Sequence, residues 1–183
     1  MANLVRLSKF LALMLRHKAD EFGLTLDSDG FTSLDSVWQQ IENRYPKQYT
    51  TDNLNILLAE GTDGKKRYEV HNGRIRALYG HGDVSEITYP AVIPPDVLYH
   101  GTIPEALTSI RSEGLTAQNR QYVHFSSNVE RATNVAGRHG SPVLLKIRAK
   151  AAYDAGIIFH NPEPLHYLVK AMPPEFIEFP GER

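Results

Sequence analysis

Arginine and histidine stand close together at three places in this 183-residue chain. The pairs are Arg16 with His17, Arg76 with His81, and Arg120 with His124. A guanidinium binds phosphate through two parallel hydrogen bonds, and a neighbouring imidazole can exchange a proton near neutral pH. Repeated pairs of this kind favour phosphate chemistry. For the first pair, a purely structural role is the alternative, because basic residues also stabilise the end of a helix.

A second pattern lies at the end of an apolar run, in Tyr99, His100, Gly101 and Thr102. The glycine allows a ligand to approach the backbone closely, and its two neighbours supply polar contacts. The run Val123–Ser126 is a further candidate, although a strand with a buried structural histidine has the same pattern. Arg138 lies in a turn bounded by glycines. This turn fits either an anion-binding site or a loop exposed to solvent.

Several common catalytic sites are excluded. The chain has no cysteine, which rules out thiolate zinc sites and cysteine nucleophiles. It contains no glycine-rich phosphate loop, no dinucleotide-binding glycine motif and no Gly-x-Ser-x-Gly turn. The histidines do not follow a zinc-binding spacing, so we expect no metal site.

The charge is balanced along the chain. The net charge is −1; residues 1–89 hold 11 Lys and Arg against 12 Asp and Glu, and the remainder holds 9 of each. Proteins that coat nucleic acid are strongly basic, so any contact with nucleic acid must use a local basic pocket. No apolar run approaches a membrane span, and the first residues lack signal-peptide character. We expect a cytoplasmic monomer that does not engage membranes.

Hydrophobic periodicity predicts helices and a hairpin in the first half. Helices are expected over 4–17, over 34–43 after the N-cap Ser33, and from Thr51, with strands over 67–70 and 74–78 around an Asn-Gly turn. Three helices followed by a hairpin are typical of a winged-helix module, which we predict for residues 1–89.

After a proline-rich stretch, the sequence pattern changes from mainly helical to short strand-like runs with helices between them. Residues 90–96 are predicted to form a linker. Short strands are expected over 97–100, 123–126, 143–147 and 176–179, with helices over 103–113 and 128–137. The pattern therefore predicts a second, mixed domain over residues 97–183. For the whole chain it predicts an α+β fold.

Taken in order, these motifs extend over nearly the whole chain. They are Leu7–Leu11 with Leu15–His17, Asp29–Phe31, Ile75–Ala77 with Gly80–His81, Leu98–Thr102, Gly114–Leu115, Arg120, Val123–Ser126, Arg138–Gly140 and Met172–Ile177. The series resembles the RNA 2′-phosphotransferases of the KptA family. This resemblance implies a winged-helix-like N-terminal lobe that binds RNA phosphate and an ADP-ribosyltransferase-like mixed α/β C-terminal lobe that binds NAD.

The resemblance also implies an activity. NAD⁺ would be a consumed co-substrate, and the RNA would carry an internal 2′-phosphate of the kind found in spliced tRNA. The phosphate would first become 2′-phospho-ADP-ribosylated. The products would be 2′-OH RNA, nicotinamide and ADP-ribose 1″,2″-cyclic phosphate, with no metal required.

Site roles follow from the same resemblance. The family's catalytic set matches Arg16, His17, Arg76 and Arg120, of which the three arginines would bind the RNA 2′-phosphate and His17 would be the acid or base. His81 would help to hold an RNA phosphate. The NAD site would use Tyr99, His100, Gly101, Thr102, His124, Ser126 and Arg138, with His100 on the adenosine-side ribose and Arg138 on the pyrophosphate.

The sequence departs from the family pattern at a few positions. Tyr79 and Gly82 stand where the family has Gln and Ser, and Gln121 interrupts a histidine-rich run. The stretch Asn161–Leu168 lacks the expected Asn-Gly-Val-Trp-Leu pattern. Two alternatives stay open: an ADP-ribosyltransferase that acts on nucleic-acid phosphate without the second step, and a non-enzymatic winged-helix protein that binds nucleic acid.

Overall fold

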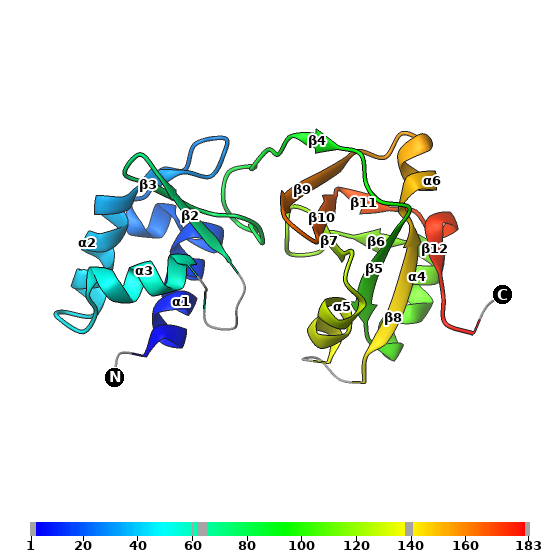
Figure 1. Ribbon diagram of the computed structural model, residues 1–183, viewed down its shortest axis with the longest axis horizontal. Coiled ribbons are helices and arrows are strands. Elements are labelled where there is room, and N and C mark those ends of the chain that lie inside the picture. Colours follow the sequence, from blue (N-terminus) through cyan, green and yellow to red (C-terminus); the bar gives the residue numbers. More distant parts are fainter. Residues whose placement is uncertain (1–2, 60, 62–65, 138–140, 182–183) are drawn as a thin grey trace. The chain divides into compact units, whose positions relative to one another are not determined.

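Helices alternate with antiparallel strands along the computed structural model of the protein (Figure 1). The structure describes residues 3–59, 61, 66–137 and 141–181. Within these ranges all strand pairs are antiparallel, which confirms the expected α+β class. The chain divides into two units, Met1–Thr88 and Tyr89–Arg183. No described helix is both long and apolar enough to span a bilayer.

The first unit combines helices with a small sheet. Its helices are α1 (Leu4–Ala12), η1 (Leu13–His17), η2 (Asp20–Phe22), α2 (Leu34–Arg44) and α3 (Thr51–Ala59). Its strands are β1 (Thr32–Ser33), β2 (Tyr68–His71) and β3 (Arg74–Ala77), in the order β1-β3-β2. In Figure 1 the β2–β3 hairpin lies beside helices α2 and α3.

The predicted first helix is confirmed, but its last turn is wider than an α-helix. Asn3 caps α1, since its Oδ1 accepts from Arg6 N at 3.0 Å. From Leu13 the helix continues as the π-helix η1, which closes with the bond from Lys18 N to Leu13 O at 2.9 Å. Such π-turns are frequent at functional sites. This one presents Arg16 and His17 at the end of the helix.

The other two predicted helices and the hairpin of this unit are also confirmed. Ser33 caps α2 by accepting from Ser36 N at 3.2 Å. The hairpin turns at Asn72 and Gly73, whose φ angles are 49° and 69° as a tight turn between twisted strands requires. Strand β1 was not predicted, because two residues are too short for a periodic pattern; it pairs with β3.

One hydrophobic core holds the first unit together. Its fully buried members include Leu7, Leu11, Met14 and Leu15 from the first helix, Val37 and Ile41 from α2, Leu57 from α3, and Tyr68 and Ile75 from the hairpin. The hydroxyl of Tyr68 donates to the backbone oxygen of Ser8 at 2.7 Å and ties the hairpin to α1. The helix that carries Arg16 and the strand that carries Arg76 therefore share one rigid core.

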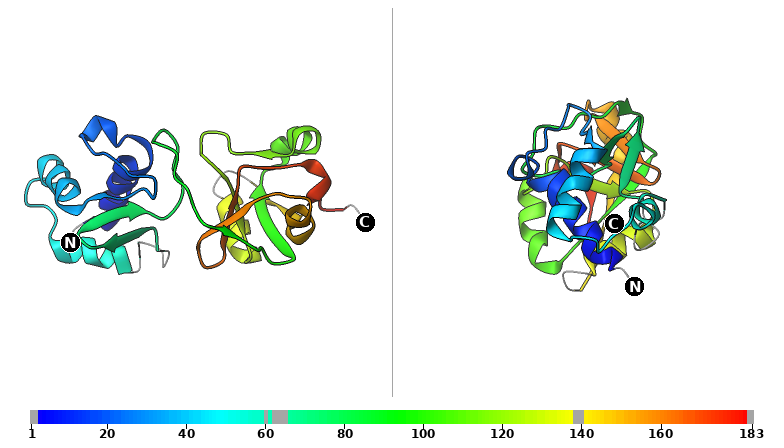
Figure 2. Two further views of the ribbon diagram at one scale, coloured as in Figure 1. Left: turned by 90° about the horizontal axis from the view of Figure 1, so that it is seen from above. Right: turned by 90° about the vertical axis from the view of Figure 1, so that its left-hand side faces the viewer.

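The second unit is built on a larger sheet, seen from two further directions in Figure 2. Its described strands β12-β8-β5-β7-β10-β9-β4 pair in that order, and β11 pairs with β6. The strands are β4 (Ala91–Val92), β5 (Val97–Thr102), β6 (Leu115–Thr116), β7 (Val123–Ser126), β8 (Val143–Arg148), β9 (Phe159–Glu163), β10 (His166–Val169), β11 (Ala171–Met172) and β12 (Ile177–Glu178).

Short helices connect these strands. They are η3 (Pro104–Ala106), α4 (Leu107–Glu113), α5 (Val129–Ala136), α6 (Ala149–Asp154) and η4 (Pro174–Phe176). Helix α5 packs across β5, β7 and β8. The core beneath includes Leu98, Phe125, Leu145, Ile147 and Phe159.

Several features of this unit differ from the expectation, among them the short elements β6, α6 and β11, which were not predicted. Ala91 and Val92, inside the predicted linker 90–96, form β4 and pair with β9. The hairpin of β9 and β10 was missed, because Pro162 and Pro164 interrupt its pattern and proline cannot donate to a strand ladder. The pairing is correspondingly irregular, with a register shift between His166 and Leu168.

Candidate functional site

The first unit holds the guanidinium of Arg16 in a tight aromatic setting. Its Cζ lies 5.6 Å from the ring centre of Tyr68 and 5.2 Å from that of Tyr79, and Nε and Nη2 are buried. The backbone of Gly80 packs against it: a Cβ at this glycine would lie 3.1 Å from Nη1. Gly80 also has a φ of +86°, which favours glycine. The arginine is thus held in one position by its surroundings.

His81 lies near enough to this arginine to feel its charge and is almost inaccessible, with 3% of its surface exposed. Burial, followed by the positive charges of Arg16, His17 and Arg76, lowers its pKa to about 4. The ring is therefore neutral at pH 7 and can act as a hydrogen-bonding group rather than as a cation. Gly30 lies against the ring, since a Cβ there would be in van der Waals contact with Nε2 at 3.5 Å.

Arg76 is oriented by an ion pair across the hairpin. It lies opposite Glu69, whose Oε2 accepts from Nε at 2.9 Å and lies 2.7 Å from Nη2. Nη1 donates to the backbone oxygen of Asp29 at 3.2 Å, and Cζ lies 4.5 Å from the ring centre of Phe31.

The predicted phosphate-binding residues of the first unit are brought together. The charges of Arg16, His17 and Arg76 all act on the ring of His81. The bond from Gly82 N to Arg16 O, at 2.9 Å, fastens the segment after β3 to the end of η1. Residues far apart in the sequence therefore form one cationic cluster.

The second unit contains a cavity of about 520 Å³. Its walls come from β5, from η3 with α4, from the segment 114–122 and from β7. Among the predicted residues, His100, Thr102, Arg120 and His124 line it. The volume lies within the range of small-molecule sites. Arg120 is exposed at its rim, where its backbone N–H donates to Ala117 O at 3.0 Å.

His100 is held in a defined tautomer. Its Nδ1 lies 2.9 Å from the backbone oxygen of His124, and because a carbonyl only accepts, Nδ1 must carry the proton. Burial lowers the pKa of this histidine, the bond to His124 partly opposes that, and Arg120 lowers it further. The neutral ring therefore keeps Nε2 as an acceptor.

The other predicted NAD-site residues lie on the neighbouring strands. Tyr99 on β5 pairs with Ser126 on β7, and Gly101 pairs with Leu144. Ser126 is buried, and its Oγ accepts from Asn128 N at 3.0 Å at the start of α5. Among the described residues that line the cavity, these three predicted positions are not found. Arg138 lies outside the described residues.

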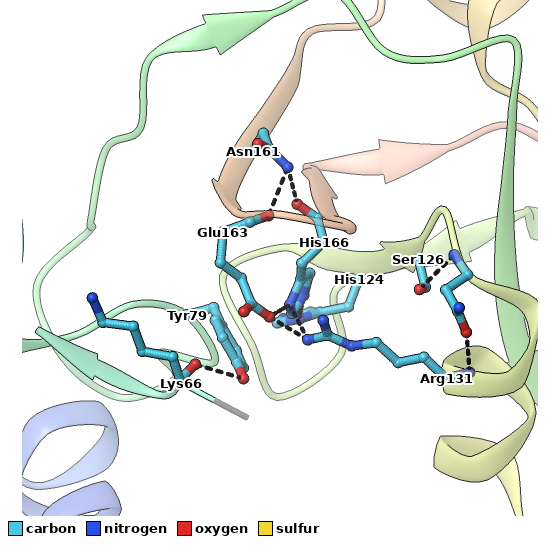
Figure 3. Close-up of polar contacts among 9 residues, drawn as sticks. Lys66, Tyr79, His124, Ser126, Arg131, Asn161, Glu163 and His166 are labelled. Carbon is cyan, nitrogen blue, oxygen red and sulfur yellow. Dashed lines mark hydrogen bonds and ion pairs between the residues drawn. The ribbon is translucent and has the colours of Figure 1, made fainter. Parts of the chain in front are cut away.

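Sequence reasoning missed a buried polar network behind His124 (Figure 3). Nδ1 of His124 lies 2.9 Å from Nε2 of His166, and Nδ1 of His166 lies 3.2 Å from Oε1 of Glu163. Arg131 on α5 pairs with the same carboxylate oxygen. The only signal in the sequence was the departure of Asn161–Leu168 from the family pattern, which did not indicate a role.

Comparison with known proteins identifies the family. Residues 2–170 match the family described as RNA 2′-phosphotransferase, Tpt1 / KptA family. The chain belongs to this family. The resemblance inferred from the motifs is thereby confirmed, and the RNA 2′-phosphotransferases are transferases.

Individual family members are similar over almost their full length. A protein named "Probable RNA 2′-phosphotransferase" from Acetivibrio thermocellus is 40% identical, over 95% of this chain and 96% of its own. Proteins of the same name from Pectobacterium atrosepticum and Streptomyces coelicolor are 38% and 36% identical, over 94% and 97% of this chain and 96% of each of theirs.

Proposed function

We propose that this protein is an NAD-dependent RNA 2′-phosphotransferase that removes an internal 2′-phosphate from RNA of the spliced-tRNA type. The reaction would pass through 2′-phospho-ADP-ribosyl RNA and yield 2′-OH RNA, nicotinamide and ADP-ribose 1″,2″-cyclic phosphate. One observation carries the proposal: in a member of the RNA 2′-phosphotransferase family, a single cavity gathers His100, Thr102, Arg120 and His124.

The chemistry of that cavity fits NAD⁺. The dinucleotide presents ribose hydroxyls and a pyrophosphate, which need neutral hydrogen-bonding groups and a cation respectively. His100 offers a neutral acceptor nitrogen and Thr102 a hydroxyl for the riboses. Arg138 is the expected cation for the pyrophosphate, whereas Arg120 is expected at the RNA 2′-phosphate. When bound, NAD⁺ supplies the electrophilic ribose carbon. The chain's own task is to bind it, to orient it and to exclude water.

The cationic cluster of the first unit fits the phosphate chemistry. A phosphate monoester is already an anionic nucleophile, so the first step needs positioning above all. The second step builds negative charge on the non-bridging oxygens, which preorganised guanidinium groups stabilise. Arg16 and Arg76 are preorganised by Tyr79, Gly80 and Glu69. With Arg120 they would bind the RNA 2′-phosphate, and His17 would carry the proton.

The proposal also includes a fold type for each of the two units. The first unit would be a winged-helix-like RNA-binding lobe, supported by its helices and its β1-β3-β2 sheet. The second would be an ADP-ribosyltransferase-like lobe, supported by the cavity beside β5 and β7. We expect the enzyme to work as a cytoplasmic monomer.

A defined RNA tests the proposal. A short RNA with one internal 2′-phosphate is incubated with the full-length protein, with and without NAD⁺ and without added metal, and all products are identified by mass spectrometry. NAD⁺-dependent formation of 2′-OH RNA and ADP-ribose cyclic phosphate is expected, and Arg120→Ala should slow it strongly.

Other outcomes contradict the proposal in distinct ways. ADP-ribosylated RNA that accumulates without the cyclic phosphate would favour the transferase that stops after the first step. Dephosphorylation that proceeds equally without NAD⁺ would overturn the co-substrate assignment. Salt-sensitive binding of unmodified RNA with no turnover would favour the binding protein.

A further inference from the structure

His124 is the cavity histidine whose ring is hydrogen-bonded to the side chain of His166. It lies on β7, and the neighbouring strand β10 places His166 beside it on the sheet, with Leu168 directly opposite His124. The two rings meet at 5.0 Å between centres, with Nδ1 of His124 and Nε2 of His166 2.9 Å apart (Figure 3). One of these nitrogens must donate to the other.

The next contact decides the direction. Glu163 pairs with His166 across the tight turn between β9 and β10, and its Oε1 lies 3.2 Å from Nδ1 of His166. Burial raises the pKa of Glu163, but the bonds from His166 and Arg131 outweigh burial and hold the pKa below its usual value. The carboxylate is therefore ionised and can only accept. Nη2 of Arg131 lies at the same 3.2 Å from Nδ1 of His166 but already donates to Oε1 of Glu163, so we assign Nδ1–H of His166 as the second donor to this oxygen.

His166 cannot easily carry a second proton. Only 6% of its surface is exposed, and burial lowers its pKa; the bond to Glu163 opposes this, whereas the charge of Arg131 adds to it. Nη2 of Arg131 lies 3.2 Å from Nδ1 of His166, and both nitrogens face the same carboxylate oxygen. A neutral His166 with its proton on Nδ1 has a lone pair on Nε2, which accepts from Nδ1–H of His124.

We propose that His166 and Glu163 are positioning residues that hold His124 in its Nδ1–H tautomer, so that Nε2 of His124 accepts a hydrogen bond from a ribose hydroxyl of NAD⁺. The role of the ligand rests on the proposed function; the tautomer does not.

The network is built like the support of a catalytic or ligand-binding imidazole, in which an outer carboxylate fixes which nitrogen is protonated. Asn161 holds the hairpin in shape, since its side-chain amide donates to the backbone oxygens of Glu163 and His166 at 2.8 and 2.7 Å. His100 is fixed in the same tautomer by the carbonyl of His124. Both cavity histidines thus have Nε2 as the acceptor nitrogen.

The arrangement does not suit a metal ion. The nitrogens of His124 and His166 point at each other instead of at a common centre. Within the described ranges no group of three or more His, Cys, Asp or Glu side chains is placed to bind one.

A pair of substitutions at one position tests the proposal. His166→Leu removes the acceptor for Nδ1–H of His124, whereas His166→Gln retains an amide oxygen near the position of Nε2. His71→Leu is the matched control: it makes the same histidine-to-leucine change at an exposed position of the first unit. The tautomer of His124 is read from long-range ¹H–¹⁵N spectra of the labelled protein without ligand, and NAD⁺ affinity from calorimetry.

The proposal expects His124 as the Nδ1–H tautomer in the wild type, in His71→Leu and in His166→Gln. In His166→Leu the proton of His124 should move to its Nε2. The Kd for NAD⁺ should then rise ~10-fold, which corresponds to the loss of one hydrogen bond. His166→Gln should restore most of the affinity.

Three results would overturn the proposal. The first is an Nε2–H tautomer of His124 in the wild type, and the second a tautomer that His166→Leu leaves unchanged. The third is a tautomer that changes while the Kd for NAD⁺ does not. A wild-type protein with the expected tautomer that fails to bind NAD⁺ would instead refute the proposed function, so the two failures are distinguishable.

Discussion

The carboxylate of Glu69 holds the guanidinium of Arg76 across the β2–β3 hairpin, with Oε2 2.9 Å from Nε and 2.7 Å from Nη2. The pair is partly exposed, with 26% of the arginine side chain and 34% of the glutamate side chain accessible. Water screens such a pair, so it contributes little to stability. Its consequence is orientation: the guanidinium is fixed before a phosphate arrives.

Replacing this arginine should therefore damage activity and spare the fold. We expect Arg76→Ala to lower single-turnover dephosphorylation on the order of 100-fold, because a preorganised charge is lost from the transition state. The free energy of unfolding should fall by less than about 1 kcal/mol. Arg74→Ala is the matched control, since Arg74 lies on the same strand and pairs with Asp27 at 2.8 Å. Equal rates in the two variants would remove Arg76 from the mechanism.

A substitution at Gly80 tests whether activity depends on the exact position of the Arg16 guanidinium. Gly80→Ala should cost about 1–2 kcal/mol of stability for its left-handed backbone. It should also reduce activity, because the new Cβ would lie 3.1 Å from Nη1 of Arg16. Gly73→Ala has a similar φ of +69° but no atom within 4 Å of the new Cβ.

Comparison of the two alanine variants separates backbone strain from displacement of Arg16. Melting temperatures should fall in both variants. The turnover rate should fall only in Gly80→Ala, and a similar loss in Gly73→Ala would show that strain alone explains the effect.

His81 should make the stability of the protein depend on pH. Its pKa is about 4 in the folded protein, against an ordinary value of 6.5. Between these values the unfolded chain binds a proton that the folded protein does not, so the free energy of unfolding falls as the pH falls through this window. The contribution is up to about 3 kcal/mol and is complete above pH 6.5.

Urea unfolding at pH 7.5 and pH 4.5 measures this effect. His81→Gln has no titrating group at this position, so its loss of stability on acidification should be smaller than that of the wild type. The idea fails if both proteins lose the same free energy of unfolding between the two pH values.

His100 offers a test of the NAD site. His100→Ala should raise the KM for NAD⁺ about tenfold or more, because Nε2 is the acceptor nitrogen of a ring fixed by the carbonyl of His124. His100→Asn keeps a donor for that carbonyl but has no counterpart of Nε2. It should therefore remain as impaired as His100→Ala, and recovery in His100→Asn would mean that the residue only supports β7.

Much of this protein follows from local patterns. The spacing of Leu4, Leu7, Leu11 and Leu15 determines the first helix, and Asn72-Gly73 determines the hairpin, because each depends on neighbours within a few residues. The ordered arginine and histidine motifs were enough to identify the RNA 2′-phosphotransferase family.

Tertiary structure alone decided how those side chains are used. No spacing in the sequence indicates that Glu69 orients Arg76, that His81 is buried and neutral, or that Gly80 packs against Arg16. Burial and charge proximity arise only when distant segments pack together, so they leave no periodic signal.

The network behind His124 makes the same point most clearly. The sequence presents Glu163 and His166 as unremarkable residues of a proline-interrupted stretch, and Arg131 as one charge on a helix. Sheet pairing between β7, β10 and β9 brings Glu163 and His166 to His124, and helix α5 adds Arg131. One ionised carboxylate then sets the proton positions on two rings. The sequence by itself determined the family and the local elements; packing decided the tautomers, the charges and the orientation of the groups that act.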